Sequence, residues 1–229
     1  MLRTALVVLG VVLSGCSANR AAPEPNAPPT YTYTVSDHGK VESRFAMRRR
    51  MLPDGGFELH FEDLDHPPGG VVSVYDAAGR PVRSLERFGD QTVSVEYSAD
   101  VARIDSGGKQ SAVKASPDEL IDPTKLWFWS VQPEPGTTTI VTWIAKNVGK
   151  TAQTRRTFEG VRTIDVLGRP EDCFLVHVQP VESDATRDME WYDGRGMLVR
   201  KEHRTTLSTY VTELVGRGSA VTPTGGSSR

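Results

Sequence analysis

The segment "MEWYDGRGMLVRKEH" (189–203) contains two stretches that alternate apolar and polar residues, with a glycine-rich turn between them. Alternation of this kind is typical of half-buried β-strands, because successive side chains of a strand point to opposite faces. Asp193-Gly194 and Gly196 can supply the positive φ values that a tight hairpin requires. The segment therefore predicts two antiparallel strands joined by a turn, and we expect replacement of Gly194 and Gly196 by Val to destabilise it, because β-branched residues resist positive φ.

The same pattern recurs along most of the chain and predicts a β fold. Gly- and Pro-rich turns separate the strands at hairpin distance, which favours antiparallel neighbours, and the one good helix signal is "SPDELIDP" (116–123). We expect an all-β domain of ten or more antiparallel strands with one short helical insert. The clearest predicted strands are 31–35, 57–62, 92–97, 137–145, 173–178 and 208–214.

The N-terminus has the organisation of a secretory signal. A positive start with Arg3 precedes the apolar run "ALVVLGVVL" (5–13), which is too short to span a membrane as a helix. The run ends in Leu-Ser-Gly-Cys (13–16), which resembles the bacterial lipobox. The resemblance implies cleavage after Gly15, a diacylglycerol on the sulfur of Cys16 and acylation of the new N-terminus.

These features divide the 229-residue chain into four parts. We expect a signal peptide (1–15), the lipidated cysteine with a Pro- and Ala-rich linker (16–30), a single β domain (31–215) and a disordered tail (216–229). The predicted location is the cell envelope, with the lipid anchor in the membrane. If the organism has two membranes, we expect the outer membrane, facing the periplasm, because Ser17 rather than an inner-membrane retention aspartate follows Cys16.

The second half of the domain carries a family resemblance. "IDPTKLWFW" (121–129), a strand ending Phe-x-Gly and a Leu-Gly-x-x-x-x-Cys strand pair (154–178), and the hairpin 189–203 occur in that order. This arrangement is similar to an uncharacterised family of bacterial envelope β proteins. That family has the general look of the half-barrels of lipoprotein-localisation carriers and their outer-membrane receptor. The resemblance implies a curved sheet, either a half-barrel or an open barrel, and provides no catalytic residues to transfer.

Several classes of function lack support in the sequence. The net charge of −2 gives no basic footprint for nucleic-acid binding. No nucleophile motif is present, and Cys173 alternates within "DCFLVHV" like a small buried residue. The polar cluster "ELHFEDLDH" (58–66) has the pattern of a solvent-facing strand surface, although histidine and carboxylate ligands leave a metal site open. We expect no catalysis, no cofactor and no bound metal.

Aromatic residues are the candidates for ligand binding. They either form the core or border an apolar cleft, and the two tryptophans near the insert are the best candidates for the cleft. The sequence thus predicts a non-catalytic lipoprotein whose β domain binds an apolar ligand or an envelope partner; the alternative is a structural or assembly protein without a small-molecule pocket. The candidate residues are Trp127, Trp129, Trp143, Trp191 and Tyr192.

Overall fold

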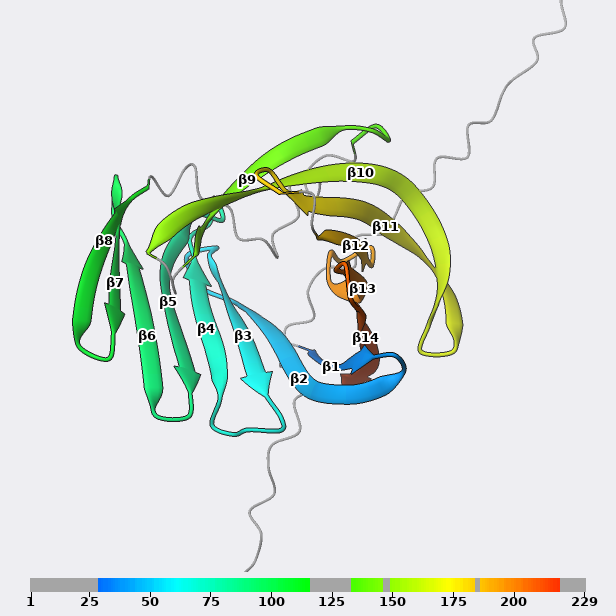
Figure 1. Cartoon of the computed structure of the whole chain (residues 1–229), viewed down its shortest axis with the longest axis horizontal. Helices are drawn as coiled ribbons and strands as arrows, with labels where there is room; N and C mark the ends of the chain where they lie inside the picture. Colours follow the sequence, from blue (N-terminus) through cyan, green and yellow to red (C-terminus); the bar gives the residue numbers. More distant parts are fainter. Residues whose placement is uncertain (1–28, 116–132, 146–148, 184–185, 219–229) are drawn as a thin grey trace, which may run out of the picture.

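The computed structural model describes residues 29–115, 133–145, 149–183 and 186–218 (Figure 1). Within these ranges the chain forms 14 strands in one antiparallel sheet, which confirms the predicted all-β fold. The described part of the chain has no helix, and hence none able to span a membrane. The predicted helical insert at 116–123 lies outside the described residues. The strands are β1 (Thr30–Asp37), β2 (Lys40–Met51), β3 (Phe57–Asp63), β4 (Gly70–Tyr75), β5 (Pro81–Phe88), β6 (Gln91–Tyr97), β7 (Val101–Ser106), β8 (Lys109–Lys114), β9 (Thr138–Ala145), β10 (Lys150–Val166), β11 (Arg169–Pro180), β12 (Arg187–Tyr192), β13 (Leu198–Arg204) and β14 (Thr209–Gly218).

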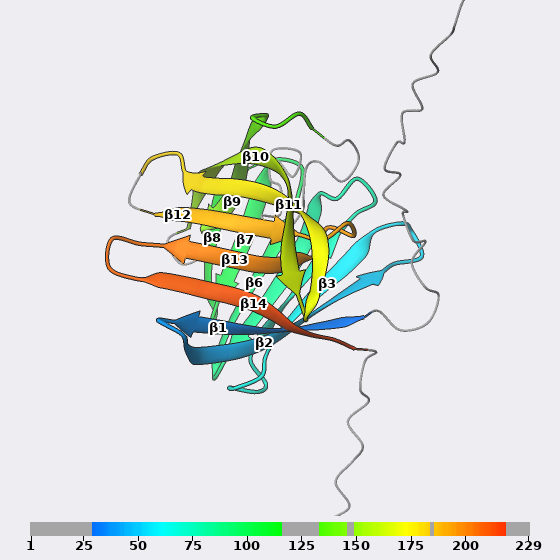
Figure 2. The same cartoon turned by 90° about the vertical axis from the view of Figure 1, so that its right-hand side faces the viewer.

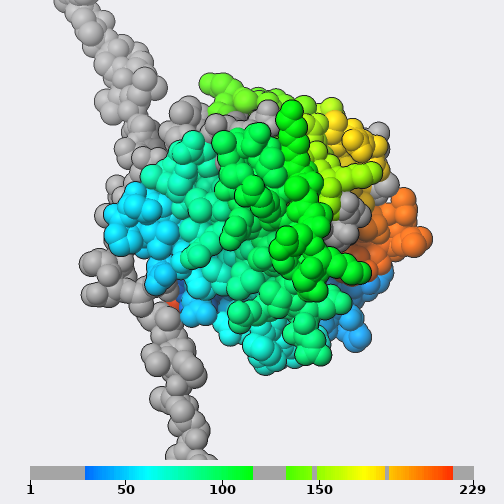
Figure 3. All heavy atoms as spheres, turned by 90° about the vertical axis from the view of Figure 1, so that its left-hand side faces the viewer, coloured from blue at the N-terminus to red at the C-terminus, as the bar shows by residue number. Residues whose placement is uncertain are grey.

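The first and last strands of the chain lie side by side in the middle of the sheet. Its order is β8-β7-β6-β5-β4-β3-β2-β1-β14-β13-β12-β11-β10-β9, so the first and last strands pair with each other. From this central pair, β1–β8 run outward on one side and β14–β9 on the other; the strands towards β8, green in Figure 3, cover one side of the molecule. The sheet curls strongly (Figures 1 and 2) but does not close, because β8 and β9 are the two ends of the strand order.

The alternation predicted from the sequence assigns each strand an inner and an outer face. On β3, Phe57, Leu59 and Phe61 point to one side, whereas Glu58 and His60 point to the other. The strand register extends these sides across the sheet. We call the side that carries Phe57 and Phe61 the inner face, because the buried apolar residues of β3–β8 lie on it, and the opposite side the outer face.

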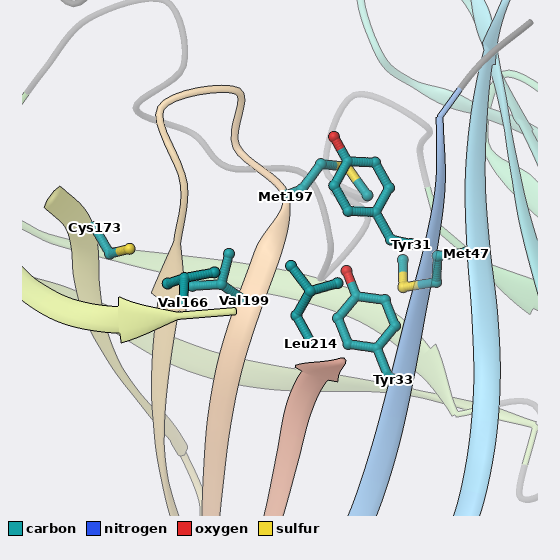
Figure 4. Packing of buried hydrophobic residues seen from close by; sticks show 8 residues of the cluster. All are labelled: Tyr31, Tyr33, Met47, Val166, Cys173, Met197, Val199 and Leu214. Carbon is teal, nitrogen blue, oxygen red and sulfur yellow. The ribbon is translucent and has the colours of Figure 1, made fainter. Parts of the chain in front are cut away.

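Buried side chains connect strands that are distant in the sequence. The largest buried cluster joins the central strands to the β10–β11 hairpin (Figure 4) and consists of Tyr31, Tyr33, Met47, Val166, Cys173, Met197, Val199 and Leu214. A second cluster holds Val95, Ile104 and Val113 of β6–β8 together with Ile144 of β9. One end strand therefore packs against residues near the other end, although the two are not hydrogen-bonded neighbours.

β10 is longer than the resemblance implies. It does not end at Phe158-x-Gly160 but continues to Val166, with a shift in register between Phe158 and Gly160. Gly160 has a φ of 105°, a value that residues with a side chain rarely adopt. The tip of the β10–β11 hairpin reaches β13 and β14 (Figure 2), and Arg217 of β14 binds Glu171 of β11 at 2.7 Å.

The β12–β13 hairpin forms where it is predicted, but only one of its two glycines needs a positive φ. Gly196 has a φ of 76°, whereas Gly194 lies outside the left-handed region. The turn is held by Asp193, whose carboxylate accepts hydrogen bonds from the backbone N–H groups of Arg195 and Met197 at 2.9 Å each. The positive φ expected at Gly194 is therefore not observed, and the side chain of Asp193 organises that part of the turn.

The first and last strands define the extent of the sheet. β1 begins at Thr30, and β14 continues through Gly218, past residue 215, at which the sequence analysis places the end of the domain. Thr30 and Gly218 are direct partners in the register, so the two chain ends leave the sheet side by side.

Candidate functional site

The inner face of the three central strands β1–β3 carries a row of stacked rings. The ring centroids of Tyr33 and Phe45 lie 4.8 Å apart, and those of Phe45 and Phe61 lie 4.7 Å apart. We call these three residues the aromatic row. The hydroxyl of Tyr33 donates to the carbonyl oxygen of Leu198 at 2.7 Å, and burial raises the pKa of Tyr33, so the ring stays neutral. The row is therefore apolar, and its one polar atom is already bonded. Tyr33 is fully buried, whereas Phe45 and Phe61 are partly buried and pack against the largest buried cluster.

The other half of the inner face carries charge. β10, β12 and β13 place ionisable side chains on this face at matching positions of the register. We call the group the interior charge cluster; it consists of Arg156, Asp188, Glu190, Tyr192, Lys201 and His203.

Glu190 is the centre of the interior charge cluster. Its Oε2 accepts hydrogen bonds from Arg156 Nη2 at 3.0 Å and from the Tyr192 hydroxyl at 2.5 Å. Its Oε1 lies 3.3 Å from Lys201 Nζ. The side chains of Arg156 and Glu190 are 2% and 7% exposed, so this ion pair is almost completely removed from water. The attraction between the two ions of such a buried pair offsets the cost of removing each of them from water.

The cluster continues from the buried pair towards the surface. Lys201 Nζ also lies 2.6 Å from Asp188 Oδ2, and Asp188 Oδ1 lies 2.5 Å from His203 Nδ1. The His203 side chain is 36% exposed, and its ring lies 6.2 Å from that of Tyr210. The inner face thus has a polar path that begins at a buried arginine and ends at a partly exposed histidine.

The shifts in pKa follow from this arrangement. Burial raises the pKa of Tyr192 far above its ordinary value, and the neighbouring Glu190 adds to the effect. Burial alone would lower the pKa of Lys201, but Glu190 and Asp188 outweigh it and the net pKa is raised. The cluster therefore pairs the two cations of Arg156 and Lys201 with the two carboxylates of Asp188 and Glu190 and a neutral phenol, so these formal charges cancel.

The aromatic residues singled out in the sequence do not form one group. Trp191 and Tyr192 are adjacent on β12 and point to opposite faces, because side chains alternate along a strand. Tyr192 is buried on the inner face, whereas Trp191 packs beside the largest buried cluster and has the Arg200 guanidinium 5.9 Å from its ring. Trp143 lies partly buried on the end strand β9. Trp127, Trp129 and Cys16 lie outside the described residues.

Cys173 is unsuited to nucleophilic chemistry. It is fully buried, and burial, with a contribution from Glu171, raises its pKa to about 12. The thiol is therefore protonated at neutral pH.

The polar segment 58–66 forms ion pairs on its own part of the sheet. Glu58 binds Arg50 at 2.6 Å and His60 at 3.1 Å, and these hydrogen bonds, led by the one from His60, lower the pKa of Glu58. In the described ranges, no group of three or more His, Cys, Asp and Glu residues is arranged to hold a metal ion.

A pocket of about 190 Å³ lies between the tip of the β10–β11 hairpin and strands β13–β14. Its lining includes Asp165, Arg200 and Glu213 and is mostly polar. Ligand pockets commonly exceed about 300 Å³ and are largely apolar. We therefore regard the inner face, not this pocket, as the candidate site.

Sequence reasoning missed the interior charge cluster. The signal was present in "MEWY", where Glu190 and Tyr192 share a face, but the partner Arg156 lies 34 residues away on β10. Alternation alone does not show that a strand directs a glutamate inward.

Comparisons with known proteins support the fold. No protein-family model matches the chain, and no curated protein matches it by sequence. The structure is similar to a β-barrel-like protein of a domain of unknown function, DUF1849, from Brucella abortus, with a TM-score of 0.61, 10% identity, and coverage of 85% of this chain and 98% of that one.

Two weaker similarities accompany it. The hypothetical lipoprotein YmcC of Escherichia coli gives a TM-score of 0.39 at 12% identity, covering 81% of this chain and 83% of that one. The Pseudomonas aeruginosa MucA/MucB complex gives 0.40 at 15%, covering 86% of this chain and 53% of that one. At these identities the similarity shows a shared fold alone: the Brucella protein supports the barrel-like β architecture, and the two weaker matches add nothing to it.

Proposed function

We propose that this chain is a lipid-anchored envelope protein that is not an enzyme and whose curved sheet binds an amphiphilic ligand, or the apolar segment of an envelope partner, on its inner face. The observation that supports this is the aromatic row on the inner face of a sheet that does not close. Cys16 is the attachment point of the anchor in this proposal.

The two halves of the inner face indicate the chemistry of the ligand. Stacked rings favour an apolar body such as an acyl chain, because burying apolar surface contributes about 25 cal/mol per Å². The interior charge cluster lies on the adjoining strands and is polar but balanced in charge. We therefore expect a ligand with an apolar body and a polar, weakly charged end.

A binding assay tests this function. The full-length lipoprotein is purified from its own membrane in mild detergent, extracted, and the extract examined by mass spectrometry for a bound amphiphile. A fluorescent fatty-acid probe then compares wild type with Phe61→Ala, which shortens the aromatic row. Phe88→Ala is the matched control, because Phe88 is an exposed ring at the end of β5.

We expect probe affinity to fall about tenfold or more in Phe61→Ala and to stay unchanged in Phe88→Ala. Absence of any extracted amphiphile together with no probe binding by wild type would reject the ligand-binding function. The structural or assembly role is then the remaining candidate, and the open edge strand β9 is the observation that favours it.

A further inference from the structure

Among the residues that the structure describes, β9 is an end strand with an open outer edge. β10 pairs with it on one side, and the strand order ends on the other. Among the described residues, none bonds to the open edge of β9. Unpaired backbone N–H and C=O groups along a strand are a template for a further strand.

The hydrogen bonds to β10 identify the groups on this edge. Phe158 N–H donates to the carbonyl oxygen of Thr137 at 2.9 Å, and alternate residues of a strand bond to the same neighbour. Residues 139, 141 and 143 therefore bond to β10. Thr138, Ile140 and Thr142 direct their N–H and C=O groups to the open edge.

The composition of β9 leaves this edge unprotected. Its sequence, TTIVTWIA, contains no charged residue, no proline and no glycine, and most of its residues favour strands. Ile140 is 50% exposed on the outer face. The other end strand, β8, has Lys109 and Lys114 at its two ends, and charged residues of this kind discourage edge pairing.

We propose that two copies of this chain pair through β9, antiparallel and centred on Ile140. This register sets Ile140 opposite Ile140 of the second copy, Thr138 opposite Thr142, and Thr139 opposite Val141. Residues that share a face then meet, and about six backbone hydrogen bonds form between the outward groups. The inference does not depend on what the inner face binds, but it rests on the lipid anchor of the proposed function.

The first half of β9 is the part available for this contact. Ile144 is buried against β6–β8, and Gly149, just beyond the strand, approaches Ser111 of β8. The end of β9 near Ala145 is therefore next to another part of the molecule. Residues 138–142 lie away from this contact, and a centre at Ile140 uses only them.

The register about Ile140 is self-complementary, which favours a second copy as the partner, and charge and size allow a weak pair. Arg155 is exposed on β10 opposite Ile140, and in the pair the two arginines would stand three strand spacings apart, about 14 Å. This exceeds the Debye length of about 8 Å at physiological salt, so they would repel each other little. A contact through five residues is smaller than the ~1,200 Å² of stable interfaces. Copies anchored in one membrane would pair because the anchor raises their effective concentration.

Disulfide trapping in membranes tests the register with the full chain. In a hydrogen-bonded antiparallel pair the opposing Cα atoms lie about 5.5 Å apart, within the ~4.4–6.8 Å that a disulfide spans. Ile140→Cys should give a dimer band under mild oxidation that a reductant removes. Thr138→Cys alone should give little dimer, but should cross-link to co-expressed Thr142→Cys.

Two further variants distinguish cross-linking through a paired edge from cross-linking by random collision of two chains. Adding Thr142→Pro to Ile140→Cys removes an outward N–H that the fold does not use, and should abolish the dimer band. Ala112→Cys on the other end strand, β8, is the matched control and should cross-link at background level. The inference is overturned if Ile140→Cys gives no dimer, if Thr142→Pro leaves the dimer unchanged, or if Ala112→Cys cross-links equally.

Discussion

At the scale of single residues, the molecule is distinguished by charges placed where a β domain usually has only apolar side chains. Arg156 and Glu190 come from strands far apart in the sequence and meet on the inner face. The sequence predicted that Cys173 is buried, and the structure confirms it. It could not predict the ion pair, because the face a glutamate takes depends on the curl of the whole sheet rather than on its neighbours in the chain.

Breaking the buried pair should cost more than removing it. Arg156→Met leaves Glu190 without its closest cation, and we expect a loss of about 3 kcal/mol in the free energy of unfolding. The double variant Arg156→Met/Glu190→Met should recover most of this loss, because no charge is then left unpaired. Urea unfolding measures both, and equal losses in the single and double variants would show that the pair is not coupled.

Stability should also depend on acid through Glu202. Burial alone would raise the pKa of this carboxyl, but hydrogen bonds from Arg204 and Arg200 lower it below its ordinary value of 4.5. The unfolded chain then binds the proton more readily, so the contribution of Glu202 is present above pH 4.5 and is lost as pH falls through the folded pKa. In urea titrations, Glu202→Gln should be less stable than wild type at neutral pH, and the difference should shrink below pH 4.5; a constant difference contradicts this.

At the scale of strands and turns, local pattern carried most of the prediction. Strands with clear alternation, such as β3, β11 and β12, lie where the sequence places them. β2 is not among the clearest predicted strands, because the consecutive Arg48, Arg49 and Arg50 interrupt its alternation. The register shift near Gly160 was missed, since a single glycine in a strand marks either an end or a bulge.

The β12–β13 turn allows a matched pair of glycine substitutions. Gly196→Val forces a β-branched residue to a φ of 76° and should lower the free energy of unfolding by about 1–2 kcal/mol or more. Gly194→Val should have a much smaller effect, because Gly194 has no positive φ and an added Cβ meets nothing within 4 Å. Thermal melting compares the two variants. Equal decreases in their melting temperatures would contradict the turn geometry.

At the scale of the whole molecule, the fold class and the antiparallel neighbours could be predicted, but the strand order could not. Hairpins follow from turns that are local in the sequence. The pairing of β1 with β14 joins the two ends of the domain, and no short-range signal specifies it. The same holds for the candidate site. Single aromatic residues could be predicted as candidates from the sequence, but the aromatic row and the interior charge cluster form only in the completed sheet.

The anchor and the last strand give two predictions at this scale. Cys16→Ser should leave the signal unprocessed and abolish incorporation of labelled fatty acid, because the sulfur that would carry the lipid is gone. Normal labelling of that variant would end the lipoprotein interpretation.

Removal of β14 should unfold the domain, because it exposes β1 and β13 in the middle of the sheet. A chain ending at Ser208 should be degraded or insoluble, whereas a chain ending at Gly218, which keeps all 14 strands, should melt like wild type. Circular dichroism and protease sensitivity compare the two. A cooperative melt of the shorter chain would show that the two sides of the sheet fold independently.

The β1–β14 pairing also determines when the sheet can be completed during export and folding. In the export that the predicted signal implies, the chain enters N-terminus first, and β1 crosses the membrane before β14. The register joins Thr30 to Gly218, so the central pair forms only after nearly the whole chain has emerged. Pairings this distant in sequence form slowly. In that proposed export, the chain would lack its central pair during transport, and the sheet would become complete only on the side of the membrane where its last strand arrives.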